Sequence, residues 1–344
     1  MRVLQVMAGA PIGGIETFFY DGVLALAEAG ITQFVVVRPN MPLHLPRLAA
    51  AGIPYATAGF SSWWPLPTVL TMRRAAAEFR PDIIQYWTGR AGQYAVAKGA
   101  FQVGWYGGYS KRRYYRTCTD FIGITDDLLR HFRSEGIAPE HMTLVHNFTG
   151  RSAAAPLARQ DFATPEGAPL LLALARLHWM KGLDTLLDAV AKLPTAYLWI
   201  AGEGPDRRKL VAQAARLGIA DRVRFLGWRE DKDALLATAD ICVVPSRQES
   251  FGAVLIEAWA AGKPLVAAAA EGPRVYVEDE KNGVLVPFND AGALAGAIGR
   301  VIADEELRAR IVEGGRKSYE ARFTKEAYVR DMLAFYERIL KGRK

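Results

Sequence analysis

The residues best suited to chemistry lie in one short segment, RQESFGAVLIE, which carries two carboxylates, Glu249 and Glu257. The small and apolar residues between them predict a helix over Phe251–Ala261. Gly262 follows at the place where a glycine commonly ends a helix. The apolar run Ile241–Val244 just before this segment is typical of a buried parallel strand. A strand, a loop and the start of a helix are therefore expected to meet here.

That junction is a predicted ligand site. Ligands of open α/β sheets bind where strands end and helices begin. The strand, the loop and the start of the helix meet at Glu249 to Ala253, and the free N–H groups there suit a phosphate. Glu249 adds a negative charge beside them, and a carboxylate binds neutral hydroxyl groups better than it binds phosphate. A ligand that carries both groups, such as a nucleotide sugar, satisfies both halves of the site.

Two cations follow the predicted strand Leu170–Ala175. Arg176 ends the strand, and Lys181 lies in the next loop, before a helix. At the carboxyl edge of a parallel sheet, the planar fork of an arginine and the point charge of a lysine are placed to hold a diphosphate. Both would stabilise the negative charge that builds on a departing phosphate. The alternative is an unrelated pair of surface cations.

Two glycine-containing loops give weaker signals. Gly227, Trp228 and Arg229 follow another strand of the same sheet, and either of the two large side chains offers a flat face to a nucleobase. The alternative is a plain turn with an exposed aromatic residue. Gly13 and Gly14 lie between the first strand and the first helix, where glycines let backbone N–H groups approach an anion. A tight turn without a ligand explains them equally well.

Strand-like and helix-like runs alternate along the whole chain. The first half opens with a strand at Val3–Met7 and a helix at Ile15–Glu28, and the second half with Leu170–Ala175 and Leu183–Leu193. This alternation is typical of parallel sheets covered by helices on both faces. The class is therefore α/β, with two doubly wound, Rossmann-like domains.

Domain boundaries follow from the breaks in this pattern. The aperiodic, proline-containing stretch 150–169 predicts a linker, and only helical patterns follow Pro287. We expect an N-terminal domain over 1–155, a C-terminal domain over 156–324, and a helix over 325–344 that packs back on the N-terminal domain.

Composition indicates an ordinary globular protein of 344 residues, with 51% hydrophobic and 23% charged residues. Residues 1–160 hold 16 Lys and Arg against 10 Asp and Glu, so nearly all of the net charge of +7 belongs to the first half. This asymmetry favours an acidic partner, although a surface tuned for solubility explains it too. Cys118 and Cys242 are predicted to be reduced thiols of a cytoplasmic protein. The histidines have no metal-ligand spacing.

Taken in order, these motifs resemble those of the family 4 retaining glycosyltransferases of GT-B fold. The resemblance covers the first loop and most of the second half, and it rests on Gly13-Gly14-Ile15-Glu16, Arg176 with Lys181-Gly182, Gly202-Glu203-Gly204, Phe225-Leu226-Gly227, Pro245-Ser246 and Glu249 through Glu257. It implies two domains that face each other across a cleft, with a C-terminal helical tail crossing back.

The resemblance also implies roles for particular residues. Arg176 and Lys181 would hold the diphosphate of the donor. Glu249 would contact the donor sugar, and Glu257 would bind the ribose hydroxyls. The amides at Ser250–Ala253 would line the sugar–phosphate site. Members of the family need no metal, because basic side chains and helix termini supply the positive charge.

The acceptor side of the resemblance is thinner. Many members carry a histidine near the reacting carbon where this chain has Gly107, beside Tyr106. A retaining front-face mechanism needs no protein base, because the leaving phosphate oxygen can take the proton of the acceptor. The basic residues Lys111, Arg112 and Arg113 follow, in a pattern similar to lipopolysaccharide-type glycosyltransferases.

Membrane contact is a further expectation. Trp63 and Trp64 are adjacent in a proline-flanked loop, and tryptophan beside cations favours the surface of an anionic membrane. The alternative is that a tryptophan is part of the core and the cations are merely solvated.

Together these expectations describe a retaining, metal-independent glycosyltransferase. Its donor would be a nucleotide-diphosphate sugar, with UDP favoured, and its acceptor a glycan or lipid-linked molecule of the cell envelope. The protein would be cytoplasmic, at or near the inner face of the plasma membrane, without a nucleic-acid partner. The rival functions are a nucleotide-sugar epimerase of the same fold and a non-catalytic basic module that binds nucleic acid or membrane.

Overall fold

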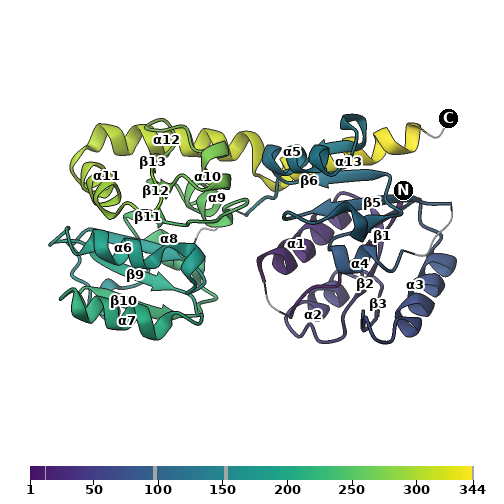
Figure 1. The fold of residues 1–344 in the computed structure, drawn as a ribbon, viewed down its shortest axis with the longest axis horizontal. Coiled ribbons are helices and arrows are strands. Elements are labelled where there is room, and N and C mark those ends of the chain that lie inside the picture. The colour runs from purple at the N-terminus through teal and green to yellow at the C-terminus, as the bar shows by residue number, and fades with distance from the viewer. Residues whose placement is uncertain (12, 96–98, 151–153, 343–344) are drawn as a thin grey trace. The chain divides into compact units, whose positions relative to one another are not determined.

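The computed structural model describes residues 1–11, 13–95, 99–150 and 154–342. The chain divides into two compact units (Figure 1). Unit 1 comprises Met1–Phe148 and Lys325–Lys344, and unit 2 comprises Thr149–Thr324. Residue 12 of the predicted first glycine loop and residues 151–153 of the predicted linker lie outside the described residues.

Unit 1 is built on a parallel sheet whose strands, within the described residues, run in the order β3-β2-β1-β4-β5-β6-β7. The strands are β1 (Arg2–Val6), β2 (Thr32–Val37), β3 (Tyr55–Thr57), β4 (Ile83–Tyr86), β5 (Phe101–Tyr106), β6 (Asp120–Gly123) and β7 (Met142–Leu144). All of β4 and all but the first residue of β1 are buried, as expected of strands covered on both faces. The order reverses between β1 and β4, which makes a switch point where the loops after these strands diverge.

Helices cover this sheet on both faces (Figure 1). They are α1 (Gly14–Glu28), α2 (Leu45–Ala50), α3 (Leu66–Phe79), α4 (Gly89–Gly92) and α5 (Asp126–Ser134), with the 3₁₀ turns η1 (Arg112–Tyr115) and η2 (Pro139–His141). The C-terminal helix α13 (Lys325–Lys341) also belongs to unit 1. Its Tyr336 hydroxyl donates to Gln85 Oε1 of β4 at 2.6 Å, and its Lys325 pairs with Glu28 of α1 at 2.7 Å.

Unit 2 repeats the scheme with the order β10-β9-β8-β11-β12-β13, again all parallel. The strands are β8 (Leu170–Leu174), β9 (Tyr197–Ala201), β10 (Val223–Gly227), β11 (Ile241–Val244), β12 (Leu265–Ala268) and β13 (Val284–Val286). The helices are α6 (Leu183–Val190), α7 (Arg207–Arg216), α8 (Lys232–Thr238), α9 (Ala253–Ala260), α10 (Glu271–Tyr276), α11 (Ala291–Ala303) and α12 (Glu305–Arg322), with the turns η3 (Arg159–Phe162) and η4 (Trp179–Lys181).

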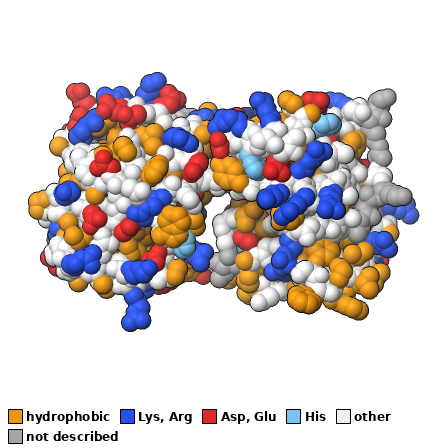
Figure 2. All heavy atoms as spheres, in the orientation of Figure 1, with side chains coloured by type: hydrophobic (Ala, Val, Ile, Leu, Met, Phe, Trp, Pro, Cys, Tyr) orange, Lys and Arg blue, Asp and Glu red, His pale blue; other side chains and the backbone are white. Residues whose placement is uncertain are grey.

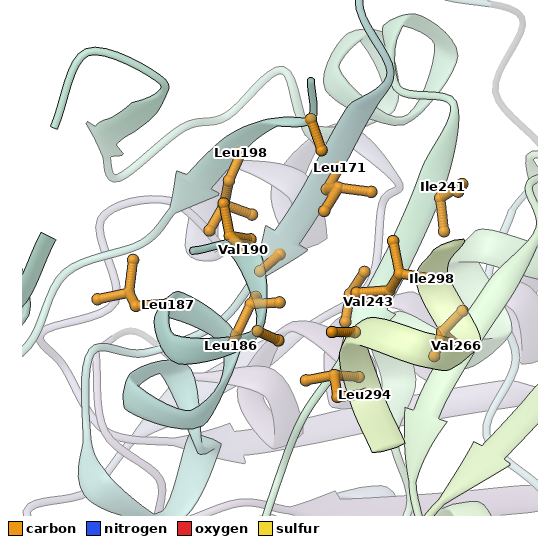
Figure 3. Close-up of a cluster of buried hydrophobic side chains, with 14 of the residues drawn as sticks. Leu171, Leu186, Leu187, Val190, Leu198, Ile241, Val243, Val266, Leu294 and Ile298 are labelled. Atoms are coloured by element: carbon orange, nitrogen blue, oxygen red, sulfur yellow. The ribbon is translucent and has the colours of Figure 1, made fainter. Parts of the chain in front are cut away.

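One face of this second sheet forms a hydrophobic core with α6 and α11. Figure 3 shows Leu171 and Val243 of the sheet facing Leu186 of α6 and Leu294 and Ile298 of α11, and all five are buried. Burial of such side chains stabilises the unit by about 1.5–3 kcal/mol each. It also fixes the positions of the loops that leave the carboxyl ends of β8 and β11.

The predicted α/β class with two Rossmann-like domains is confirmed, but the predicted start of the helix that carries Glu257 is wrong. The helix predicted to begin at Phe251 begins at Ala253, because Gly252 adopts a left-handed conformation with φ of 84°. Glu249 therefore lies in the loop, and Glu257 lies on the helix. The end is as predicted: Gly262 donates to Trp259 O and the next residue to Ala258 O, which is the Schellman pattern.

Candidate functional site

The site begins at the switch point of unit 2, where β8 and β11 are neighbours and pair Ile241 with Leu171. The chain turns to opposite sides of the sheet after these two strands, so their carboxyl-terminal loops separate and leave room for a ligand. The loop after β8 carries Arg176 and Lys181. The loop after β11 carries Ser246 and Glu249.

The two loops are held against each other by backbone contacts. The N–H groups of Arg247 and Gln248 both donate to Met180 O, at 2.8 and 3.2 Å. Gly182 has φ of 62°, and a Cβ there would lie 2.0 Å from Pro245 O. Only glycine allows both the left-handed backbone and this close approach.

This contact brings together two residues 68 positions apart in the sequence. Lys181 Nζ donates to Glu249 Oε2 at 2.6 Å, and the Ser246 hydroxyl lies 3.4 Å from the same oxygen. The Lys181 and Glu249 side chains are 26% and 18% exposed, so the pair is only partly screened by water. An ammonium has three donors, so Lys181 keeps donors for a further anion while it holds the carboxylate in place.

Backbone hydrogen bonds fix Glu249 as well. Its C=O accepts from Gly272 N at 2.6 Å, and its N–H points to Glu271 Oε2 at 3.4 Å. The loop then reaches Gly252 and the start of α9. The N–H groups of Ala253 and Val254 precede the hydrogen bonds of that helix, the first of which joins Leu255 N to Gly252 O at 2.9 Å, and they lie at the positive end of its dipole.

Glu257 faces a partner that the sequence did not reveal. Lys232, at the start of α8, pairs with Glu257 on α9, whose side chain is 14% exposed. Burial, reinforced by the nearby charge of Glu257, raises the pKa of the Cys242 thiol to about 12. Cys242 is therefore an unreactive thiol beneath the site, and Cys118 is also buried and free.

Arg176 differs from Lys181 in its surroundings. Its side chain is exposed, and its guanidinium has no hydrogen bond or ion pair with any residue in the described ranges. Its five N–H donors are directed neither to the protein core nor to a carboxylate.

Arg247 is a second residue that sequence reasoning missed. Its guanidinium binds Asp184 with two hydrogen bonds of 2.8 Å and donates to Trp179 O at 2.6 Å. Burial opposes ionisation of Asp184, but the hydrogen bonds and charge of Arg247 outweigh it and lower the pKa of that carboxyl. The only hint of this role in the sequence was that Arg247 lies two residues before Glu249. Arg247 anchors the loop that carries Lys181.

The predicted base-binding residues lie after β10. Trp228 is 62% exposed, so its indole face is open. Arg229 is bound by both oxygens of Asp231, at 2.8 and 2.5 Å, and its guanidinium lies over the Phe162 ring. Arg229 is thus fixed in place, and Trp228 is the more available flat surface. Gly227 is left-handed, with φ of 72°.

In unit 1, a side chain of α1 packs against the glycine loop that precedes this helix. Glu16 of α1 is buried and accepts from Ala10 N at 2.7 Å. A Cβ at Gly13 would lie 2.1 Å from Glu16 Oε2, whereas one at Gly14 would meet nothing within 4 Å. The carboxylate therefore occupies one side of this loop and leaves the Gly14 side open.

The predicted acceptor residues lie in two environments. Tyr106 is fully buried against Tyr115, so only its backbone is available to a ligand. Lys111 is exposed, and Arg112 donates to Gly136 O from the neighbouring loop. Arg113 bonds to the Tyr114 hydroxyl and lies over its ring. At Gly107 a Cβ would lie 2.9 Å from Ile15 Cδ1, so a larger side chain needs a local shift.

No cluster of three or more His, Cys, Asp or Glu side chains that could hold a metal ion occurs in the part of the chain that the structure describes. The positive charge in direct contact with Glu249 is the ammonium of Lys181.

Two Rossmann-like units, each with a parallel sheet and its switch point, are the architecture of the GT-B fold. A crystal structure of Anabaena Alr3699/HepE in complex with UDP shares this fold with a TM-score of 0.86 and 23% identity, over 98% of this chain and 100% of that one. The family model described as glycosyl transferases group 1 matches residues 155–318.

Two relatives in Rhizobium meliloti (strain 1021) match nearly end to end. The lipopolysaccharide core biosynthesis glycosyltransferase LpsE is 34% identical, over 92% of this chain and 93% of its own. The corresponding LpsD is 33% identical, over 98% of each chain. The chain therefore belongs to the group 1 family of glycosyl transferases and is a glycosyltransferase, and the resemblance found in its motifs is confirmed.

Proposed function

We propose that the protein transfers a sugar from a nucleotide-diphosphate sugar, with UDP favoured, to a hydroxyl group of a cell-envelope glycan, with retention at the anomeric carbon. The observation that carries this proposal is the Lys181–Glu249 pair at the switch point of unit 2, beside the start of α9. It sets a cation for phosphate next to a carboxylate for sugar hydroxyls. The UDP complex of the Anabaena protein supports the choice of base.

Each residue then has a task on the donor. Arg176 and Lys181 hold the diphosphate, and the amides at Ser250–Ala253 line the sugar–phosphate junction. Glu249 accepts from the sugar hydroxyls, and Glu257 accepts from the ribose. Trp228 covers the base, with Gly227 and Arg229 next to it in the chain. The donor role of Gly13 and Gly14 in unit 1 stays a prediction from the sequence.

The reaction needs no protein base. The bond between the anomeric carbon and the phosphate oxygen breaks, and the acceptor oxygen bonds to the same face of that carbon. The acceptor proton passes to the departing phosphate oxygen. Arg176, Lys181 and the first amides of α9 stabilise the charge on that phosphate, which is the usual role of preorganised donors in such sites.

We assign the acceptor to unit 1 and to the class of lipopolysaccharide core glycans. Both Rhizobium relatives are described as lipopolysaccharide core biosynthesis glycosyltransferases, and they cover nearly the whole chain. Lys111, Arg112 and Arg113 would face the anionic acceptor, together with the backbone at Tyr106 and Gly107. Figure 2 shows Lys and Arg side chains gathered on one face of this unit.

A thermal-shift series tests the donor assignment. UDP and UDP-sugars should raise the melting temperature of the protein, because a ligand that binds only the folded state stabilises it by about 2.7 kcal/mol at 100 times its Kd. GDP and ADP should raise it much less. A flat response to every nucleotide would refute the proposal. Conversion of a UDP-sugar without any acceptor, followed by NMR, would indicate an epimerase instead.

We further propose that unit 1 docks on the inner face of an anionic membrane. Trp63 and Trp64 are 94% and 64% exposed, and the adjacent face of α3 exposes Leu66, Leu70 and Arg73. Aromatic and aliphatic side chains beside cations suit the boundary of a lipid bilayer. No helix in the described residues is long and apolar enough to cross a membrane.

Sedimentation with vesicles containing phosphatidylglycerol tests this docking. The double variant Trp63→Ser, Trp64→Ser should bind about tenfold more weakly, a loss of about 1.4 kcal/mol. The matched control Trp228→Ser removes an exposed tryptophan of unit 2 and should bind like the wild type. Equal losses in the two variants would rule out a specific docking face.

A further inference from the structure

Unit 1 contains a cavity of about 460 Å³ at the carboxyl edge of its sheet. Its walls follow four adjacent strands: Pro11 comes after β1, Arg38 after β2, Gly59 to Trp63 after β3, and Arg90 lies on α4 after β4. This is the edge at which open α/β sheets bind ligands, and the volume is that of a small-molecule site. None of the residues assigned above to the donor or acceptor lines this cavity.

The cavity is positively charged. Arg38 and Arg90 line it, and none of the described residues around it is an Asp or Glu. A larger cavity in unit 2, of about 700 Å³, also contains cations, but these are bound by the protein itself. There Arg159 pairs with Asp240 at 2.7 Å and Lys263 donates to Ala237 O at 2.8 Å. In the unit 1 cavity, by contrast, neither Arg38 nor Arg90 has a carboxylate partner within the described residues.

Arg38 is the residue that points to a ligand. It is half-buried, and its Nε–H is fully buried without a hydrogen-bond partner in the described part of the chain. A buried donor without an acceptor costs about 1–3 kcal/mol, so native proteins rarely keep one without a purpose. Because protein atoms enclose this Nε–H, an anion in the cavity would be bound by the terminal Nη–H groups of the same guanidinium, which pair well with the oxygens of a phosphate or carboxylate.

Phe60, another residue that lines the cavity, is held in place by several contacts. Phe60 has φ of 49°, a strained value for a bulky residue, and three contacts hold it there. Its N–H donates to Thr68 Oγ1 at 3.0 Å, its C=O accepts from Arg90 Nη1 at 3.2 Å, and its ring packs against Tyr94. The Tyr94 hydroxyl also donates to Ser61 O at 2.7 Å. One N–H group of Arg90 thus holds the side chain against Phe60, and its other N–H groups remain available to a ligand in the cavity.

We propose that this cavity binds an oxyanion, a phosphate or carboxylate, that the sugar acceptor carries. The terminal N–H groups of Arg38 make the principal contact, and Arg90 makes the second. The inference rests on the proposed function in one respect, namely that unit 1 receives the acceptor.

NMR of the arginine Nε–H groups tests the proposal in the intact chain. The Arg38 signal is the one missing from the Arg38→Lys variant. Inorganic phosphate and glucose 6-phosphate should shift it, glucose should not, and Arg90→Gln should weaken the phosphate response about tenfold. The control Arg330→Gln, which alters an exposed arginine of α13 paired with Asp331, should leave the response unchanged.

Three results would overturn the proposal. The first is no shift of the Arg38 signal with phosphate or glucose 6-phosphate. The second is a shift only with phosphatidylglycerol vesicles, which would assign the site to a lipid headgroup. The third is an equal shift with UDP, which would assign it to the donor. UDP binding by calorimetry reports separately on unit 2, so failure here is distinguishable from failure of the donor assignment.

Discussion

Glu249 shares one carboxylate oxygen between Lys181 and Ser246, at 2.6 and 3.4 Å. The pair joins the group assigned to the sugar with a group assigned to the phosphate. A substitution at Lys181 or at Glu249 should therefore disturb the other side chain of the pair. The effect on sugar transfer and the effect on nucleotide binding are separated by measuring the two independently.

Replacing Glu249 by Gln should reduce sugar transfer about 100-fold while UDP affinity stays within about threefold. The variant loses the charge that faces the sugar, but Lys181 stays and its ammonium becomes fully available to phosphate. Rates of UDP release and calorimetry with UDP measure the two effects. Glu313→Gln, an exposed residue of α12, is the control. A parallel fall in UDP affinity would contradict the assignment.

Arg176→Ala and Lys181→Ala should differ in one measurable respect. Both should weaken UDP binding about tenfold, because each removes a cation from the diphosphate. Only Lys181→Ala should also lower the free energy of unfolding, by about 1–3 kcal/mol, because it leaves the partly buried Glu249 without its ion pair. Calorimetry and urea unfolding give the two quantities. Equal stability losses would show that Arg176 has a structural partner.

At the scale of elements, the junction of the β8 and β11 loops depends on Gly182. Gly182→Ala places a Cβ 2.0 Å from Pro245 O and should destabilise unit 2 by several kcal/mol. Gly218→Ala is the matched control: its φ of 70° is similar, but nothing lies within 4 Å of the added Cβ. It should cost only the strain of the left-handed backbone, about 1–2 kcal/mol. Equal free energies of unfolding for the two variants would exclude the steric explanation.

Elements with strong apolar patterns were predictable from the sequence. The strand Ile241–Val244 has the predicted bounds, and the helix predicted over Ile15–Glu28 begins one residue earlier at Gly14, because local apolar patterns decide both elements. The strand Tyr55–Thr57 was missed, since three partly exposed residues at the edge of a sheet carry almost no pattern. The start of α9 was misplaced because the left-handed Gly252 delays it.

The site was predictable only as a set of residues on one sheet edge. Parallel strands end at the same edge, so Arg176, Lys181 and Glu249 could be grouped from the sequence. The ion pair between Lys181 and Glu249 could not, because it depends on how two loops pack. Lys232 was missed for the same reason: its contact with Glu257 requires the packing of α8 beside α9.

At the scale of the molecule, the chain forms unit 1, then unit 2, and returns to unit 1 with α13. Ending the chain at Thr324 should therefore destroy the cooperative unfolding of unit 1. The missing helix buries Tyr328, Met332, Phe335 and Tyr336, which stabilise the fold by about 1.5–3 kcal/mol each. UDP binding by unit 2 should persist.

Scanning calorimetry with and without UDP measures both effects, because UDP raises only the transition of unit 2. The milder variant Tyr336→Phe removes one hydrogen bond to Gln85. It should lower the free energy of unfolding of unit 1 by about 1 kcal/mol, and with it the transition temperature of that unit. An unchanged unit 1 transition in the shortened chain would contradict the role of α13.

The salt bridge in the β8–β11 crevice also bears on selectivity. An acid and a base that cancel one another offer little attraction to small ions such as free phosphate or chloride, which are abundant in any cell. A molecule with both a negative moiety and a cluster of alcohols can engage both partners together. The enzyme would thereby discriminate against common metabolites that match only half of the pattern.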